Sequence, residues 1–303
     1  MQGQEISTRE AWGSKVAFIF AATGSAIGLG NIWRFPTVVS QNGGAVFVLV
    51  YVLAVAFIGF TVMLAELTIG RHTQRNPVGA FESIKPRTPW KFIGYLGMIT
   101  GVCILSFYAV VAGWAAGYIF KMASGALKGK LTAEMSNKIF TEFSSDPIQV
   151  FLFFGLIMGL TIFIVSKGVK KGIERWTKVL MPVLFLLIVF LAIRALTLPG
   201  AGKGIAFYLR PDFSKLNGTV ILYALGQAFF SLSLGMGIML TYGSYISKSD
   251  NLVTSAGWVC FFDSLIAFLA GVIIFPTLFA IPGIAPTAGP GLVFKVLPLI
   301  FSK

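Results

Sequence analysis

Glycines and polar residues interrupt two apolar stretches of this sequence, and such interruptions can bind ions and polar solutes. The first lies in residues 16–36, VAFIFAATGSAIGLGNIWRFP, where Gly24, Gly28 and Gly30 precede Asn31. Each interior glycine costs a helix about 1 kcal/mol relative to alanine, so three within one span predict a break. Lipid cannot satisfy the N–H and C=O groups that a break frees. The break is therefore a candidate binding site, with a packing face of small residues as the alternative.

The second interruption lies in residues 226–245, GQAFFSLSLGMGIMLTYGSY. Ser231, Ser233, Gly235 and Gly237 divide an apolar helix and give SLSLGMG, a loose echo of GSAIGLG in the first stretch. Two interrupted segments in corresponding halves indicate a transporter built on inverted repeats, with its site near the bilayer midplane.

Two acids lie within apolar stretches, Glu66 in AELTIGR and Asp263 in WVCFFDSLIAF. A carboxylate at the bilayer centre costs about 2.5–3.5 kcal/mol, so it faces a partner or a cavity. For Glu66 we expect capture by nearby arginines. No cation is near Asp263 in the sequence, and an ion site is expected there.

Other chemistry is disfavoured. Cys103 and Cys260 sit in apolar runs and are expected to be buried thiols, while the single histidine, His72, lies at a predicted helix end. No nucleophile, base and orienting acid gather at one depth, which argues against an enzyme, and no organic cofactor is indicated.

The composition predicts a multi-pass membrane protein. Of 303 residues, 56% are hydrophobic and 12% charged, whereas soluble domains carry about 25% charged residues. The polar N-terminus, MQGQEISTREAW, shows no cleavable signal peptide. A hydrocarbon core of about 30 Å needs about 20 residues per helix, and we predict seven spans: 13–39, 45–70, 91–121, 148–166, 175–196, 218–246 and 252–280.

Basic residues cluster in alternate loops and set an orientation. One cluster follows the second span and the other follows the fourth: Arg71, Arg75, Lys85, Arg87 and Lys91, then Lys167, Lys170, Lys171 and Arg175. The positive-inside rule places both loops and the N-terminus in the cytoplasm, and residue 303 outside. The net charge of +13 is thus an orientation signal, with no need to invoke nucleic acid.

Several motifs together resemble the neurotransmitter:sodium symporter family, in particular its bacterial branch that carries hydrophobic amino acids. They are REAW at 9–12, GSAIGLGNIWRFP, SFYAVVAGW at 106–114, TYGSY at 241–245 and the Asp-containing seventh span. The resemblance implies an all-α, LeuT-like 5+5 inverted-repeat fold with helices 1 and 6 broken at mid-membrane. Spans one to five form the first repeat, and spans six and seven begin the second.

The resemblance also implies an amino-acid site and two sodium sites. Amides near Leu29 and Gly30 with the Tyr108 hydroxyl hold the substrate carboxylate, and the ammonium and side chain meet Ala26, Gly28, Ile104, Phe230, Ser231, Ser233 and Met236. The first sodium is bound by Ala26, Asn31, Ser231 and Asp263. The second uses the carbonyls of Gly24 and Ile27, and its other ligands come from an eighth helix.

Chloride dependence and gating follow from the same resemblance. Tyr51, Gln227 and Ser231 match the chloride site, but Ala267 replaces the usual serine or glutamate, and Asp263 could supply the negative charge. We therefore predict chloride independence.

The gates also follow from the resemblance. Arg34 with Phe230 resembles the outer gate, and the inner gate comprises Arg9, Trp12, Ser244 and Tyr245. Gly172 and Pro182 resemble a site of fifth-helix unwinding, with a static proline kink as the alternative.

The sequence ends in IAPTAGPGLVFKVLPLIFSK, which resembles the start of extracellular loop 4 (281–303), whereas family members have eleven or twelve helices. We therefore expect a truncated form, from a gene fragment, a frameshift or a partial sequence, and an inactive chain stays open as an alternative. The predicted partners are an amino acid, sodium and the lipid bilayer of a bacterial inner membrane. An amino-acid-binding sensor stays open as an alternative. A seven-helix receptor or retinal pump is disfavoured, because two spans are broken and 252–280 contains no lysine.

Overall fold

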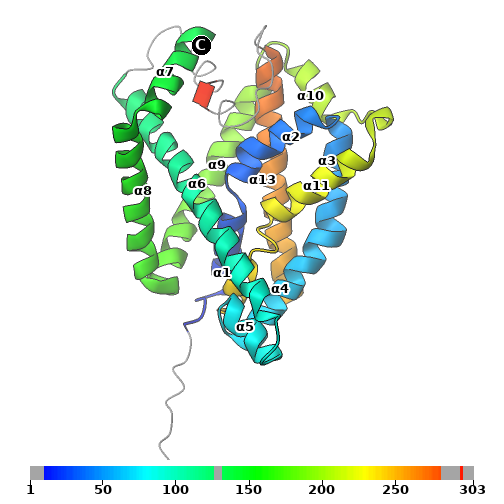
Figure 1. Cartoon of the computed structure of the whole chain (residues 1–303). Helices are drawn as coiled ribbons and strands as arrows, with labels where there is room; N and C mark the ends of the chain where they lie inside the picture. Colours follow the sequence, from blue (N-terminus) through cyan, green and yellow to red (C-terminus); the bar gives the residue numbers. More distant parts are fainter. Residues whose placement is uncertain (1–9, 126–131, 281–293, 296–303) are drawn as a thin grey trace, which may run out of the picture.

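A computed structural model describes residues 10–125, 132–280 and 294–295 (Figure 1). The predictions for Arg9 and for the loop 281–303, apart from Phe294 and Lys295, therefore lie outside the described residues. Helices occupy all seven predicted ranges. They are α1 Lys15–Ala26 with α2 Phe35–Gln41, α3 Ala45–Ala54 with α4 Phe60–Thr73, α6 Lys91–Ala123, α8 Pro147–Ser166, α9 Arg175–Leu196, α11 Gly218–Ser231 with α12 Ile238–Gly243, and α13 Leu252–Ala280.

Three π-helical segments join or extend these helices, at Gly30–Arg34, Val55–Gly59 and Val169–Glu174. Within the described ranges, five continuous helical segments are long and apolar enough to cross a membrane. A sixth span results if α1 and Gly30–Gln41 are taken as one helix bent by 52°. With 14 residues, α11 is shorter than a span and is continued by α12 only after the second break.

Three short helices lie in connections that hydropathy left as loops: α5 Pro77–Ile84, α7 Ala133–Ser145 and α10 Ala201–Leu209. A 3-10 turn, Phe213–Lys215, follows α10. Local signals start two of these helices. The Asn76 side chain accepts a hydrogen bond from the Gly79 amide with Pro77 as first helical residue, and Thr132 caps α7 in the same way.

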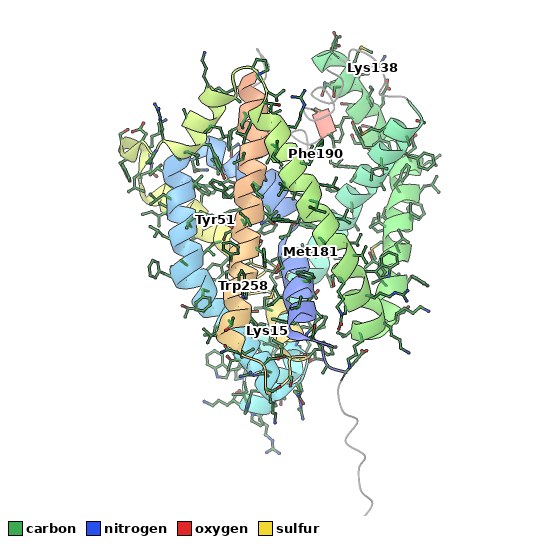
Figure 2. The ribbon with its side chains drawn as sticks, turned by 180° about the vertical axis from the view of Figure 1, so that it is seen from behind. Lys15, Tyr51, Lys138, Met181, Phe190 and Trp258 are labelled. Carbon is green, nitrogen blue, oxygen red and sulfur yellow. The ribbon has the colours of Figure 1, made fainter. Side chains whose placement is uncertain are left out.

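The core is built around α13, which packs against α1, α4, α9 and α10. In Figure 1, α8 lies at the side of the molecule against α6, and α6 crosses the molecule from α8 to α5. No residue of α8 is buried, and its Phe151 is 72% exposed, as a lipid-facing helix requires. The prediction of two buried thiols is correct for Cys260 and wrong for Cys103, which is exposed on α6. Lys15 and Lys138 lie near opposite ends of the molecule (Figure 2).

Candidate functional site

The first predicted break is present between α1 and the π-helical turn Gly30–Arg34. The α-helical pattern ends when the Ile27 amide donates to the Thr23 carbonyl at 2.7 Å. Beyond Ile27, a side chain replaces the helical carbonyl as acceptor, because Asn31 Oδ1 accepts the Gly28 amide at 3.1 Å. The break is thus held by a polar side chain that is itself fully buried.

The second predicted break separates α11 from α12. Three residues in five adopt left-handed backbone, with φ +56° at Ser233, +78° at Gly235 and +71° at Gly237. Glycine adopts this region freely, whereas serine does so at a cost. The glycine spacing that marked this segment in the sequence therefore serves an irregular connection between α11 and α12 that a continuous helix cannot contain.

Glu66 has a different partner from the one expected. Its Oε1 accepts the amide of Gly235 at 2.7 Å, and its Oε2 is buried without a hydrogen bond. None of the ion pairs among the described residues involves Glu66, so the expected capture by arginines is wrong. The carboxylate on α4 instead supports the open backbone of the second break.

A buried polar cluster joins the two breaks. Asn31 Nδ2 lies 2.8 Å from Asp263 Oδ1, 3.1 Å from the Asp263 carbonyl and 3.0 Å from Ser231 Oγ. Ser231 Oγ donates to Asp263 Oδ2 at 2.8 Å, and the Tyr51 hydroxyl lies 3.4 Å from that carboxylate oxygen. Asn31 and Asp263 are both 0% exposed. Within the described structure the carboxylate has no cationic partner, which is an arrangement suited to a bound cation.

A cavity of about 280 Å³ lies between the two breaks and α6. Gly28 and Gly30 let neighbouring rings approach the chain, because a Cβ at Gly30 would lie 3.0 Å from Phe230 Cε1 and one at Gly28 3.4 Å from Tyr108 Cε1. The Tyr108 hydroxyl also interacts with the Gly30 amide. Most predicted substrate residues line this cavity: Ala26, Gly28, Gly30, Ile104, Tyr108, Phe230, Ser233 and Met236.

The cavity differs from the prediction at its margins. Leu29 and Ser231 do not line it, whereas Ser25, Gly101, Leu105 and Ile238 do. Gly101 and Leu105 could have been found from helical spacing, since they share a face of α6 with Tyr108. The other two required the geometry of the breaks, because each lies where the chain leaves or rejoins a helix.

At the outer side of the cavity, Arg34 joins the two broken spans. Its guanidinium carbon lies 4.8 Å from the centre of the Phe230 ring, and its Nη1 donates to Gln227 Oε1. Gln227 Nε2 in turn donates to the Gly30 carbonyl at 3.1 Å. Gln227 is therefore engaged with the outer side of the first break. Ala267 of α13 is buried and offers no polar group to an anion.

At the inner side, Trp12 closes over α12. Its ring stacks on Tyr242 with centroids 5.6 Å apart, its Nε1 donates to the Tyr242 carbonyl at 3.2 Å, and its amide donates to the Tyr245 carbonyl at 3.1 Å. Ser244, which follows the last residue of α12, is buried and its hydroxyl donates to the Thr241 carbonyl of that helix. The residue that sequence reasoning missed here is Tyr242, which meets the tryptophan face to face.

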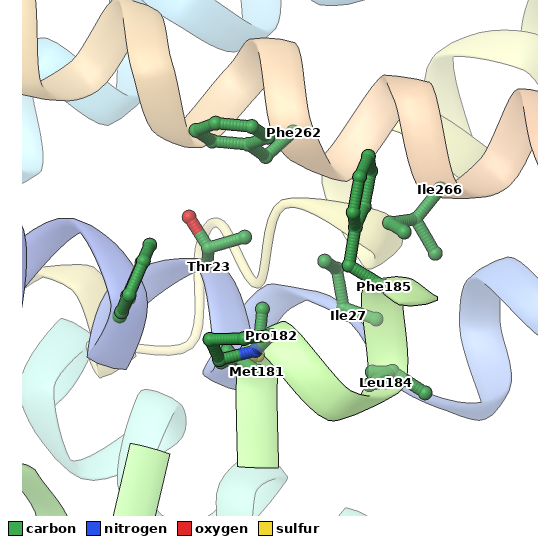
Figure 3. A pocket seen from close by; sticks show the side chains of 9 residues that line it. Thr23, Ile27, Met181, Pro182, Leu184, Phe185, Phe262 and Ile266 are labelled. Atoms are coloured by element: carbon green, nitrogen blue, oxygen red, sulfur yellow. The ribbon is translucent and has the colours of Figure 1, made fainter. Parts of the chain in front are cut away.

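The residues of the second predicted sodium site lie beside an apolar groove between α1, α9 and α13 (Figure 3). The groove holds about 220 Å³ and includes Ile27 and Pro182, and Gly24 approaches Met181 of α9. Gly172 lies in the π-helical turn that opens the fifth span, and Pro182 is inside α9. The fifth helix is thus continuous, with a wide turn rather than an unwound segment at Gly172.

No cluster of three metal-binding His, Cys, Asp or Glu side chains occurs among the described residues. Two apolar spans broken around a shared polar cluster define the class: a multi-pass α-helical membrane protein with a LeuT-like inverted-repeat fold.

Comparison with known proteins agrees, because residues 9–140 and 134–302 match the family described as "Sodium:neurotransmitter symporter family". The chain belongs to this family. The crystal structure of MhsT in complex with L-phenylalanine superposes with a TM-score of 0.90 at 50% identity, covering 97% of this chain and 66% of that one.

Two curated relatives extend the comparison. An uncharacterized sodium-dependent transporter of Bacillus subtilis, YhdH, is 43% identical over 96% of this chain and 64% of its own length. Another, of Haemophilus influenzae, is 39% identical over 97% of this chain and 66% of its own. The chain therefore spans about two thirds of the length of these relatives.

Proposed function

We propose that this architecture couples the movement of sodium and of a hydrophobic or aromatic amino acid across the plasma membrane of a bacterium, with the N-terminus in the cytoplasm. The observation that carries the proposal is Asp263, a fully buried carboxylate with uncharged partners from both broken spans. Sodium would supply the missing positive charge, with oxygens of Asn31, Ser231 and the Ala26 carbonyl as further ligands.

The amino acid would bind in the adjacent cavity. Freed amides near Leu29 and Gly30, with the Tyr108 hydroxyl, suit a carboxylate, because helix N-termini carry partial positive charge. Carbonyls at the C-terminal end of α11, at Phe230 and Ser231, with the Ser233 hydroxyl, suit an ammonium, because helix C-termini carry partial negative charge. The side chain would meet Ile104 and Met236, and a methionine wall adapts to bulky apolar groups. A relative crystallised with phenylalanine supports this class of substrate.

In alternating access, the contacts of Arg34 would open and close the outer side of the cavity, and those of Trp12 the inner side. The fifth helix would open at the wide turn that contains Gly172. Gly24 and Ile27 would contribute carbonyls to a second sodium. Chloride would not be needed, because Asp263 would supply a fixed negative charge beside Tyr51 and Ser231.

The experiment is binding and uptake of labelled phenylalanine by the full chain in proteoliposomes. We expect both to require sodium and to fail with potassium, and to persist when gluconate replaces chloride. Asp263→Asn should abolish the sodium requirement or the binding. Sodium-dependent binding without uptake would identify an amino-acid-binding protein instead and overturn transport, while uptake that needs chloride would overturn only the proposed independence.

A further inference from the structure

A polar cleft lies at the C-terminal end of α4. This is the end of the molecule that carries α5 (Figure 1). Thr68, Arg71 and His72 come from the last turns of α4, and Lys248 comes from the loop between α12 and α13. The cleft has a volume of about 390 Å³. Two segments distant in sequence thus bring cationic and donor side chains to one concave surface.

The cleft collects positive charge without balancing it. Its lining contains no acid, and among the ion pairs of the described residues none includes Arg71 or Lys248. Asp250, the nearest acid along the loop, contributes its backbone carbonyl, which accepts Arg71 Nη1 at 2.7 Å. Like charges held together repel, so a bound anion would stabilise this arrangement.

The donors suit a phosphate group in particular. The bond to the Asp250 carbonyl fixes the plane of the Arg71 guanidinium and leaves its other N–H groups for a ligand. A planar guanidinium matches phosphate oxygens, and lysine adds a mobile point charge. The Thr68 hydroxyl donates to the Leu64 carbonyl at 2.7 Å, so it forms wall and acceptor rather than a further donor.

The position of the cleft indicates where such a ligand is presented. It lies where α4 ends and α13 begins, on the face that the positive-inside rule assigns to the cytoplasm, where acidic lipids attract basic residues near the surface. We propose that this cleft binds a phosphate group, carried either by an acidic phospholipid headgroup or by a free phosphate at the membrane surface. The site is separate from the transport pathway and does not depend on the proposed substrate.

The test compares Arg71→Gln/Lys248→Gln with Lys85→Gln/Arg87→Gln, which removes the same charge from the neighbouring loop outside the cleft. Native mass spectrometry of the purified chain measures retained phosphatidylglycerol against phosphatidylcholine. Hydrogen bonds from charged donors to phosphate are among the strong ones, so losing both cleft cations should lower the retention of phosphatidylglycerol at least about tenfold. The control variant should stay within a factor of two to three of the unmodified chain.

A second arm adds inorganic phosphate at millimolar concentration. Displacement of phosphatidylglycerol by phosphate would identify the headgroup phosphate as the ligand, and phosphate binding without lipid preference, lost in the cleft variant, would identify free phosphate. Both results support the site. Equal losses in both variants, or no binding that depends on Arg71 and Lys248 while thermal unfolding shows both variants folded, would overturn it.

Discussion

Replacing Asn31 by alanine should destabilise the protein more than its single side chain suggests. Asn31 Nδ2 lies within hydrogen-bonding distance of three acceptors, two of them on Asp263, and its Oδ1 holds the Gly28 amide. Hydrogen bonds to a charged group contribute about 1.5–3 kcal/mol, and losing a partner of a buried charge costs about 3–5 kcal/mol. We therefore expect the free energy of unfolding to fall by about 3–5 kcal/mol.

The matched control is Asn217→Ala, which removes an exposed N-cap that accepts the Val220 amide at 3.0 Å. Such caps contribute about 1 kcal/mol. For a chain of this size each kcal/mol shifts the unfolding midpoint by about 2–4 °C, so thermal unfolding in detergent should separate the variants by several degrees. Only Asn31→Ala should also lose stabilisation by sodium over potassium. Equal midpoints for the two variants, with the sodium effect intact in both, would refute the role assigned to the cluster.

Three further predictions concern the surroundings of the breaks. Gly30→Ala should weaken phenylalanine binding at least several-fold in an equilibrium binding assay. The added Cβ would lie only 3.0 Å from Phe230 Cε1 and would push the ring aside. Unchanged affinity would show that the ring moves freely. Glu66→Ala should speed hydrogen exchange of the Gly235 amide by roughly tenfold, whereas Glu66→Gln should change it less because an oxygen acceptor stays. Two backbone amides in the turn after α8 donate hydrogen bonds to the Glu10 carboxylate and lower its pKa below the usual value. The stability that this carboxylate contributes is therefore present near neutral pH and is lost as the pH falls through the lowered pKa. Limited proteolysis of the N-terminal segment should accordingly increase in acid and be pH-independent in Glu10→Gln.

The sequence was sufficient for features that leave a local mark. Gly28 and Gly30 lie at the first break, and Gly235 and Gly237 adopt left-handed backbone in the second, so both breaks are marked by a residue type. The left-handed Ser233 carries no such mark in the sequence. A lone acid such as Asp263 in an apolar run likewise predicts its own partners, because burial without them is too costly. On α6, Gly101 and Leu105 share a helical face with Tyr108, so the spacing could also have identified these two cavity residues.

What the sequence could not supply were contacts chosen by packing. Glu66 has arginines nearby in sequence, yet it reaches Gly235, because the orientation of α4 against the second break decides which donor is available. Tyr242 and Tyr245 are equivalent in a motif, and only the stacking geometry shows that Trp12 lies on the first. The exposed Cys103 shows a related limit, since an apolar run does not reveal whether a side chain faces protein or lipid.

The hydrogen bonds of Asn31 explain why ion and amino acid should depend on one another. One side-chain amide both terminates the first break, through the Gly28 amide, and binds Asp263 through its nitrogen. A cation entering beside Asp263 competes for the oxygens that the nitrogen now holds, so the amide must turn its own oxygen toward the ion and release the Gly28 amide. That amide borders the amino-acid cavity, where a carboxylate can accept it. Sodium binding would thus create an unpaired donor that the amino acid satisfies, and each ligand would raise the affinity for the other by the same factor.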